Sequence, residues 1–555
     1  MLVTRGEKRA TPGHRGDFWP YWCAVVVWLV SGYREVRVSR TGSLTRHHES
    51  DLGSNRGSRR LVLFVLSLSV LIINLDGTIL NVALPSIVRD LHATSSQLQW
   101  IVDAYVIVLA GLLLAAGSLG DHVGRKRVFL VGLGVFALGS ALSAFSGSTS
   151  SLVAARAFMG VGGAAVMPST LSILTNVFTA PHDRARAIGI WSGTNGLGLA
   201  LGPLVGGWLL AHYWWGSVFL INVPISLVAA VIAVIVVPDS KNVDAAAPDF
   251  VGAIASLVGV ALLLWGIIEA PAKGWLSPSI VLAILGAVAV VGGLVWWERR
   301  STHPLIELSF FRLRRFSVAM GGLGLAVFAL AGTMFLLTQY LQFSLGYSAF
   351  ATGLRITPIA VVLIVVAAFS TTLARYAGTK IVVVAAMVLI ALGLQLLSAV
   401  TVHTTYTDAL PAFFLLGIGS GLAIAPCTDS VMGSVPAELA GVGSATNSTA
   451  LQIGSALGVA VIGSLLNTRY QSRIDLALVG HAVPSQVAAL IRSSLGGALA
   501  VAQRTGGDAG LQLAAAARQS FLAGLDFAVD VAAAIVGVAA LIVAALLPSR
   551  APQGK

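Results

Sequence analysis

The chain has 555 residues, of which 56% are hydrophobic and only 10% are charged, and its mean hydropathy is +0.86. Soluble domains carry about 25% charged residues. A chain this apolar has too few polar residues to form the surface of a water-soluble fold. The net charge of +12 raises the question of nucleic-acid binding. The basic residues, however, lie in short loops between apolar runs, as the positive-inside rule expects. We therefore expect a membrane protein without a nucleic-acid partner.

Apolar runs of about 20 residues recur along the chain, and each is long enough to cross a bilayer as a helix. No segment shows the alternating pattern of a membrane β-barrel, so the predicted class is an all-α membrane protein with fourteen spans. The predicted spans are 61–87, 98–119, 127–147, 151–174, 186–210, 216–237, 249–269, 277–297, 317–343, 350–374, 379–399, 408–428, 441–466 and 524–547.

The loops between the spans differ in charge and indicate the orientation. Alternate loops carry "DHVGRKR" (121–127), "HDRARA" (182–187) and "ARYAGTK" (374–380), whereas the opposite loops are nearly free of Lys and Arg. Basic loops stay in the cytoplasm. This predicts that both ends of the fourteen-span core are cytoplasmic.

Three segments lie outside this pattern. Residues 1–59 contain the apolar run "FWPYWCAVVVWLV" (18–30), which is short for a span, and we expect either a disordered extension or a misassigned translation start. Residues 467–523 are rich in Ala, Ser and Gly and predict a loosely ordered extracytoplasmic loop with a short surface helix. Residues 549–555 form a cytoplasmic tail. The two cysteines, Cys23 and Cys427, are too far apart to indicate a disulfide framework or a metal site.

Two spans carry similar stretches of small residues, "GLGLALGPLVGG" (196–207) and "QIGSALGVAVIGS" (452–464). Small residues at four-residue spacing let another helix approach closely. The two spans would be equivalent in a pair of six-helix halves with two helices inserted between them, which resembles the parallel-repeat plan of major facilitator transporters. The alternative is that glycine-rich membrane helices resemble one another by chance.

Further motifs resemble the same family. The loop "GSLGDHVGRKRVFL" (117–130) is similar to the family's signature loop, and the resemblance implies a charge latch that holds the outward-facing state. The stretch 196–207 resembles the motif found mainly in antiporters that export, although its glycines would also serve simple helix packing. The signature residues are Gly117, Asp121, Gly124, Arg125, Lys126 and Arg127, and the antiporter-motif residues are Gly198, Gly202, Pro203, Gly206 and Gly207.

The stretches "LDGTILNVALP" (75–85), "GIIEAPAKGW" (266–275) and "WERRSTHPLIEL" (297–308) narrow the resemblance to the fourteen-span drug:proton antiporter family. The resemblance covers about residues 60 to 548. It implies the major facilitator fold with a six-helix bundle at 60–240, two inserted helices at 241–300 and a second six-helix bundle at 301–548.

Asp76, Asp103 and Arg156 are ionisable residues inside predicted spans, where charge is expensive and indicates function. A rise of about 1.5 Å per residue places Asp76 about 22 Å from the cytoplasmic end of its span. The same count places Asp103 and Arg156 about 8 Å from the outer end. In a hydrocarbon core of about 30 Å the three fall near one level. We expect a coupled cluster that exchanges protons for a cationic substrate; the alternative is a static buried ion pair that only orients helices.

Other polar and aromatic residues inside the spans are candidates for a substrate cavity, since aromatic faces accept cations. Interhelical hydrogen bonding or anchoring at the membrane interface would explain them equally. These candidates are Asn81, Trp100, Tyr105, Gln339, Tyr340, Asn447 and Gln452, with Glu269, Asp429, Asp526 and Asp530 as weaker candidates near span ends.

The chain shows no nucleotide-binding loop, metal cluster or nucleophile constellation, so we expect neither an enzyme nor a cofactor. The resemblance implies a proton-coupled antiporter that exports amphipathic, cationic drugs or antibiotics across the bacterial cytoplasmic membrane by alternating access. Its partners would be protons, small amphipathic substrates and the lipid bilayer, and we expect a monomer. A dedicated exporter of an endogenous metabolite or lipid precursor, and a membrane scaffold without transport, remain alternatives.

Overall fold

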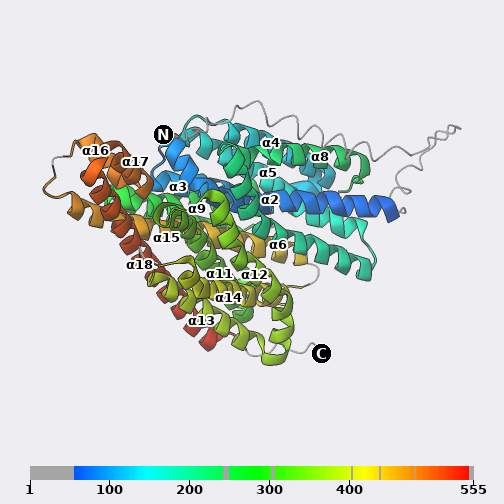
Figure 1. Cartoon of the computed structure of the whole chain (residues 1–555). Helices are drawn as coiled ribbons and strands as arrows, with labels where there is room; N and C mark the ends of the chain where they lie inside the picture. Colours follow the sequence, from blue (N-terminus) through cyan, green and yellow to red (C-terminus); the bar gives the residue numbers. More distant parts are fainter. Residues whose placement is uncertain are drawn as a thin grey trace.

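The computed structural model describes residues 56–241, 249–301, 307–401, 404–436, 439–481 and 483–548. Within these ranges the regular structure is entirely helical (Figure 1). Fourteen helices of the described part are long and apolar enough to cross a membrane, which matches the predicted number of spans. The apolar run at 18–30 and the tail at 549–555 lie outside the described residues.

The first six spans correspond to seven helices, because the sixth is divided at Ile221. They are α2 (Arg56–Leu91), α3 (Ser95–Val123), α4 (Arg125–Ala144), α5 (Thr149–Val177), α6 (Pro181–His212), α7 (Ser217–Leu220) and α8 (Asn222–Val236). Sequence signals set several boundaries. Thr94 caps α3 reciprocally with Gln97, and Ser148 caps α5 reciprocally with Ser151, so each pair satisfies backbone groups at a helix start.

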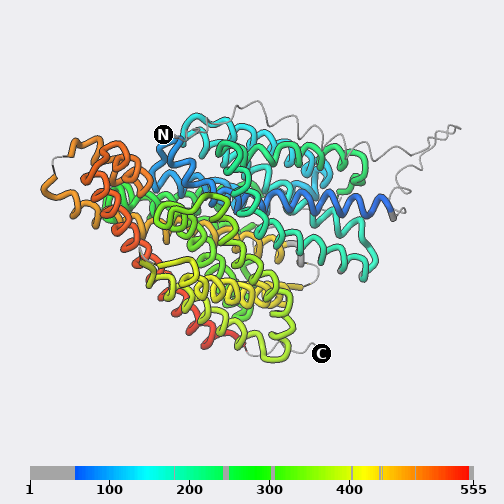
Figure 2. The backbone as a smooth tube through the Cα atoms, viewed as in Figure 1, coloured from blue at the N-terminus to red at the C-terminus, as the bar shows by residue number. Residues whose placement is uncertain are grey.

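The remaining chain contains the two inserted helices and a second set of spans. They are α9 (Phe250–Lys273), α10 (Pro278–Glu298), η1 (Leu308–Arg312), α11 (Arg314–Gln339), the π-helical turn η2 (Tyr340–Ser344), α12 (Ala349–Ala377), α13 (Thr379–Ser398), α14 (Tyr406–Met432), α15 (Ala440–Leu478), α16 (Ser485–Ser493), α17 (Leu495–Thr505) and α18 (Gly507–Leu546). Figure 2 shows the two sets lying side by side, with α16 and α17 projecting at one end.

The two sets repeat one packing pattern, and this repetition defines two bundles of six spans. In the first, α2 packs on α6 and α3 on α5; in the second, α11 packs on α15 and α12 on α14. The turn from α3 to α4 is made by Gly124 at φ +126°, and the equivalent turn from α12 to α13 by Gly378 at φ +90°. Only glycine adopts such angles without steric cost, so the same backbone turn is encoded twice.

The bundles contact each other through reciprocal pairs, α6 with α12 and α15 with α3, while α9 packs on both α3 and α15. The contacts gather near one end of the molecule. Gln99, in the first turns of α3, donates hydrogen bonds to the Val459 and Ala460 carbonyls of α15, and Gln342 of η2 donates to the Val82 carbonyl of α2. We call this end the closed end.

Residues 467–523 differ from the predicted loosely ordered loop. α15 continues to Leu478, α18 begins at Gly507, and α16 and α17 lie between them. The buried Tyr470 hydroxyl donates to the Ile491 carbonyl at 2.8 Å, and Ile491 itself is buried. The segment therefore has a small core of its own, which composition alone does not reveal.

Candidate substrate and proton site

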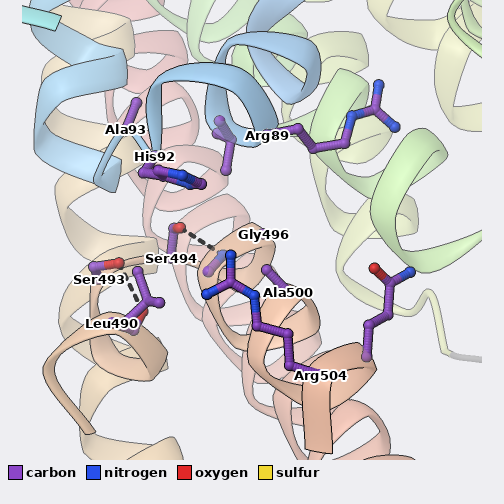
Figure 3. A pocket seen from close by; sticks show the side chains of 12 residues that line it. Arg89, His92, Ala93, Leu490, Ser493, Ser494, Gly496, Ala500 and Arg504 are labelled. Carbon is purple, nitrogen blue, oxygen red and sulfur yellow. Dashed lines mark hydrogen bonds between the residues drawn. The ribbon is translucent and has the colours of Figure 1, made fainter. Parts of the chain in front are cut away.

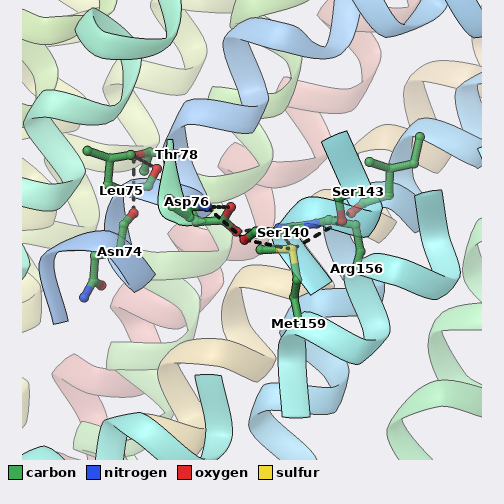
Figure 4. Close-up of polar contacts among 10 residues, drawn as sticks. Asn74, Leu75, Asp76, Thr78, Ser140, Ser143, Arg156 and Met159 are labelled. Carbon is green, nitrogen blue, oxygen red and sulfur yellow. Dashed lines mark hydrogen bonds and ion pairs between the residues drawn. The ribbon is translucent and has the colours of Figure 1, made fainter. Parts of the chain in front are cut away.

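A buried ion pair joins two helices of the first bundle (Figure 4). The Arg156 Nη1 of α5 donates to the Asp76 carboxylate of α2, and the two side chains are 1% and 0% exposed. Asn222, the first residue of α8, donates its Nδ2 to the other Asp76 oxygen at 2.9 Å. Both carboxylate oxygens are thus occupied, as burial of a charge requires.

The Arg156 guanidinium is held on several sides. Its Nε donates to the Ile101 carbonyl of α3 at 3.1 Å. Its Cζ lies 4.4 Å from the centroid of the Tyr105 ring and 5.6 Å from that of Phe219, so two aromatic faces add cation–π attraction. Tyr105, expected to face a cationic substrate, here faces a cation of the protein itself.

Asp103 is buried, and neither of its carboxylate oxygens has a hydrogen-bond partner among the described residues. No ion pair or hydrogen bond in the described part joins Asp103 to Asp76 or Arg156. It lies one helical turn after Gln99, which bonds to α15 of the second bundle. The three residues expected to form one cluster are therefore an ion pair and a separate, unpartnered carboxyl.

The other cavity candidates are distributed over both bundles. Trp100 donates its Nε1 to Glu269 of α9 at 3.3 Å, and Gln339 donates to the Phe335 carbonyl of its own helix at 3.1 Å. The buried polar atoms without a hydrogen-bond partner in the described ranges include Asn81 Oδ1, the Tyr340 hydroxyl and Asn447 Oδ1. Gln452 is partly buried on α15. Trp100 and Gln339 are thus satisfied within the protein, whereas Asn81, Tyr340 and Asn447 each keep a polar atom without a hydrogen-bond partner in the described ranges.

The signature loop has the internal ion pair that its sequence suggests. Arg125 Nε donates to Asp121 at 2.7 Å, and the Arg125 backbone N–H donates to the Ser240 carbonyl at 2.9 Å. Lys126 Nζ donates to the Val234 carbonyl of α8 at 2.9 Å. Gly117 and Arg127 lie on either side of the Gly124 turn. The loop thereby ties the α3–α4 turn to the end of α8.

The antiporter-motif glycines of α6 allow two close helix contacts. A Cβ at Gly198, Gly202 or Gly206 would lie within 3.0 Å of α2, and at Gly202 it would be 1.9 Å from Thr78 Oγ1. A Cβ at Gly207 would lie 2.7 Å from the Phe350 Cα of α12, and the Pro203 carbonyl approaches Gly353 of the same helix. One face of the motif therefore positions the helix that carries Asp76, and another contacts the second bundle.

Sequence reasoning missed Asn222 and Met159. Asn222 interrupts the apolar sixth span, and a polar residue within such a run is the signal that could have found it. Met159 accepts hydrogen bonds from Ser140 and Ser143 and lies 3.8 Å from Arg156 Nη1. A methionine in an apolar run carries no such signal.

Comparisons with known proteins agree with this fold. The sequence profile of the Major Facilitator Superfamily matches residues 66–459. The chain is 36% identical over 485 residues to the multidrug efflux pump LfrA of Mycolicibacterium smegmatis, which covers 87% of this chain and 95% of that protein. It is 34% identical to the tetracenomycin C resistance and export protein of Streptomyces glaucescens, covering 88% of this chain and 91% of that protein.

Among solved structures, the inward-facing, occupied form of a bacterial homologue of the human lysosomal transporter Spinster superposes with a TM-score of 0.66. It covers 89% of this chain and 98% of that chain at 16% sequence identity, which supports the fold alone. With the matching profile, the fourteen membrane-crossing helices and relatives that are efflux transporters, the chain belongs to the Major Facilitator Superfamily.

Proposed function

We propose that this protein is a proton-coupled antiporter that exports amphipathic, cationic drugs across the bacterial cytoplasmic membrane. The observation that carries the proposal is the pair of acidic sites in the first bundle: Asp76 neutralised by Arg156, and Asp103 buried without a partner. Relatives along almost the whole chain are a multidrug efflux pump and an antibiotic export protein. The antiporter-like motif of α6 supports export through its resemblance to the motif found mainly in exporters, and it contacts both the Asp76 helix and the second bundle.

In this proposal Asp103 carries the exchanged proton. An ionised carboxylate without a partner is strongly disfavoured in an apolar interior, whereas the neutral acid is tolerated there. Opening of the cavity admits water, which allows Asp103 to release the proton. A cationic substrate would then bind to the ionised Asp103 carboxylate in place of the proton. Asp76 is a positioning residue, since Arg156 and Asn222 already occupy its two oxygens.

Transport in this proposal moves residues 60–240 against residues 301–548. With both ends of the core in the cytoplasm, the closed end faces outward. Toward the other end of α6, a Cβ added to Gly189 or Gly193 would meet no atom within 4 Å. This difference in packing along α6 supports a cavity that opens to the cytoplasm.

The test uses the purified full-length protein in liposomes, with ethidium as the cationic probe and a pH-sensitive dye inside. We expect an imposed pH gradient to drive ethidium movement, and ethidium addition to drive proton movement in the opposite direction. Asp103→Asn should abolish proton movement and weaken ethidium binding, because the cation loses its carboxylate partner. Asp508→Asn removes an exposed carboxylate at the start of α18 and should leave both fluxes unchanged.

Three results would count against the proposal. Proton movement that survives in Asp103→Asn would exclude Asp103 as the coupling residue. Ethidium flux that ignores the pH gradient would exclude proton coupling altogether. Absence of flux for ethidium and a panel of cationic drugs would favour a dedicated metabolite exporter or a scaffold.

A further inference from the structure

A cavity of about 550 Å³ lies beside the closed end, between the end of α2 and the α16–α17 segment. Its polar lining comes from both bundles, as Figure 3 shows, and consists of Arg89, His92, Ser493, Ser494, Gln503 and Arg504. It is distinct from the buried Asp76–Arg156 pair, whose residues do not line it. Neither the resemblance nor the relatives' names assign a ligand to this place.

The cavity has a cationic lining. Two arginines and a histidine contribute to its wall, and no Asp or Glu does. The Arg504 guanidinium makes no hydrogen bond or ion pair within the described ranges, and in Figure 3 it extends toward Ser494 and Gly496. Arg89 donates one hydrogen bond to Ser86 at 3.0 Å, which leaves its other N–H groups unused. Such a lining attracts an anion and repels the cations proposed as substrates.

We propose that this cavity binds a net-anionic phosphate group, carried either by an anionic lipid headgroup or by a small soluble molecule. Guanidinium groups match phosphate oxygens through paired N–H donors, and the Ser494 hydroxyl and the Gln503 amide supply neutral donors beside them, whereas the Ser493 hydroxyl already donates to the Leu490 carbonyl. The first turn of α17 also borders the cavity at Gly496 and Gly497, and its helix dipole favours negative charge. Val88 and Leu490 form an apolar wall for the organic part of the ligand.

The ligand acts as a bridge between the two bundles. Arg89 belongs to the last turn of α2 and His92 to the connection between α2 and α3, whereas Arg504 belongs to α17. Ser95 of α3 also donates to the Ser493 carbonyl at 3.0 Å, so the two walls already touch. Any conformation that separates the bundles at this end divides the cavity. A ligand that bridges both walls therefore favours the conformation in which the two bundles stay in contact at this end.

The test measures binding and does not depend on what the protein transports. The full-length protein in neutral detergent and a phosphate-free buffer is titrated with inorganic phosphate while its thermal unfolding midpoint is followed. In parallel, native mass spectrometry compares retention of phosphatidylglycerol with that of phosphatidylcholine. The variant Arg89→Gln/Arg504→Gln removes two exposed charges and leaves the core intact. Arg473→Gln is the matched control, an exposed arginine of the same region outside the cavity lining.

We expect phosphate or phosphatidylglycerol to bind, and the double variant to weaken that binding about tenfold or more, as the loss of charge-assisted hydrogen bonds implies. Arg473→Gln should bind like the native protein, and Arg504→Lys should retain part of the affinity. Binding of phosphatidylglycerol without phosphate identifies a lipid, and the reverse identifies a soluble ligand. The proposal is overturned if neither probe binds, or if the double variant binds as well as Arg473→Gln does.

Discussion

Breaking the Asp76–Arg156 pair should destabilise the protein far more than breaking an exposed pair of the same residue types. The two side chains are 0% and 1% exposed, and removal of one partner from such a pair costs about 3–5 kcal/mol because the other charge is left uncompensated. The matched control is Asp475–Arg492, whose side chains are 45% and 51% exposed. Exposed pairs contribute about 0–1 kcal/mol.

The two single substitutions differ in the contacts that they leave to the remaining charged side chain, and this difference predicts which one destabilises more. In Asp76→Asn the guanidinium keeps the Ile101 carbonyl and the Tyr105 and Phe219 faces. In Arg156→Gln the carboxylate keeps only the Asn222 amide and gains an amide donor. We therefore expect Arg156→Gln to lower the unfolding midpoint more than Asp76→Asn. The double variant should be more stable than the sum of both effects predicts, because no unpaired charge remains.

The assay is the midpoint of unfolding in detergent micelles, measured for the two singles and the double, with Asp475→Asn and Arg492→Gln measured alongside. The reasoning is refuted if the buried singles are no less stable than the exposed ones, or if the two buried effects simply add. Ethidium flux measured on the same variants tests the positioning role. We expect Asp76→Asn to reduce the rate but to retain coupling to the pH gradient.

Three further predictions follow from single contacts. Gly202→Ala should destabilise by about 1–3 kcal/mol, since its Cβ would overlap Thr78, whereas Gly193→Ala in the same helix meets nothing and should be neutral or stabilising in the same unfolding assay. Asn222→Ala should cost about 1.5–3 kcal/mol through loss of its hydrogen bond to Asp76, and the loss should shrink to about 0.5–1.5 kcal/mol in the background of Asp76→Asn, whose amide oxygen is a neutral acceptor, if that bond is the cause. Gly124→Ala should cost about 1–3 kcal/mol in the same assay, because φ +126° with ψ +123° is a backbone conformation that only glycine adopts freely; an unchanged midpoint would exclude backbone strain.

Several features of the fold could be predicted from local sequence. Every predicted span corresponds to one membrane-length helical segment, the sixth of which is divided at Ile221, although α15 and α18 extend well beyond the predicted ends. Those extensions contain charged residues or are rich in alanine, and they contact α16 and α17, so a criterion based on apolar length cannot detect them. The surroundings of Asp103 could be predicted only in part: counting depth placed it level with Asp76 and Arg156, but neither of its oxygens has a hydrogen-bond partner among the described residues.

Apolar length and short motifs are local properties, so the sequence was enough to predict a membrane protein with fourteen spans and the motifs of one transporter family. Tertiary structure alone decided which polar groups meet. Asp76 contacts Arg156, which is 80 residues away in the sequence, and Asn222, which is 146 residues away. Depth along a helix does not specify the direction of a side chain, which turns by about 100° per residue and is set by packing against neighbouring helices. The cationic cavity likewise exists only because α2 and α17 lie side by side.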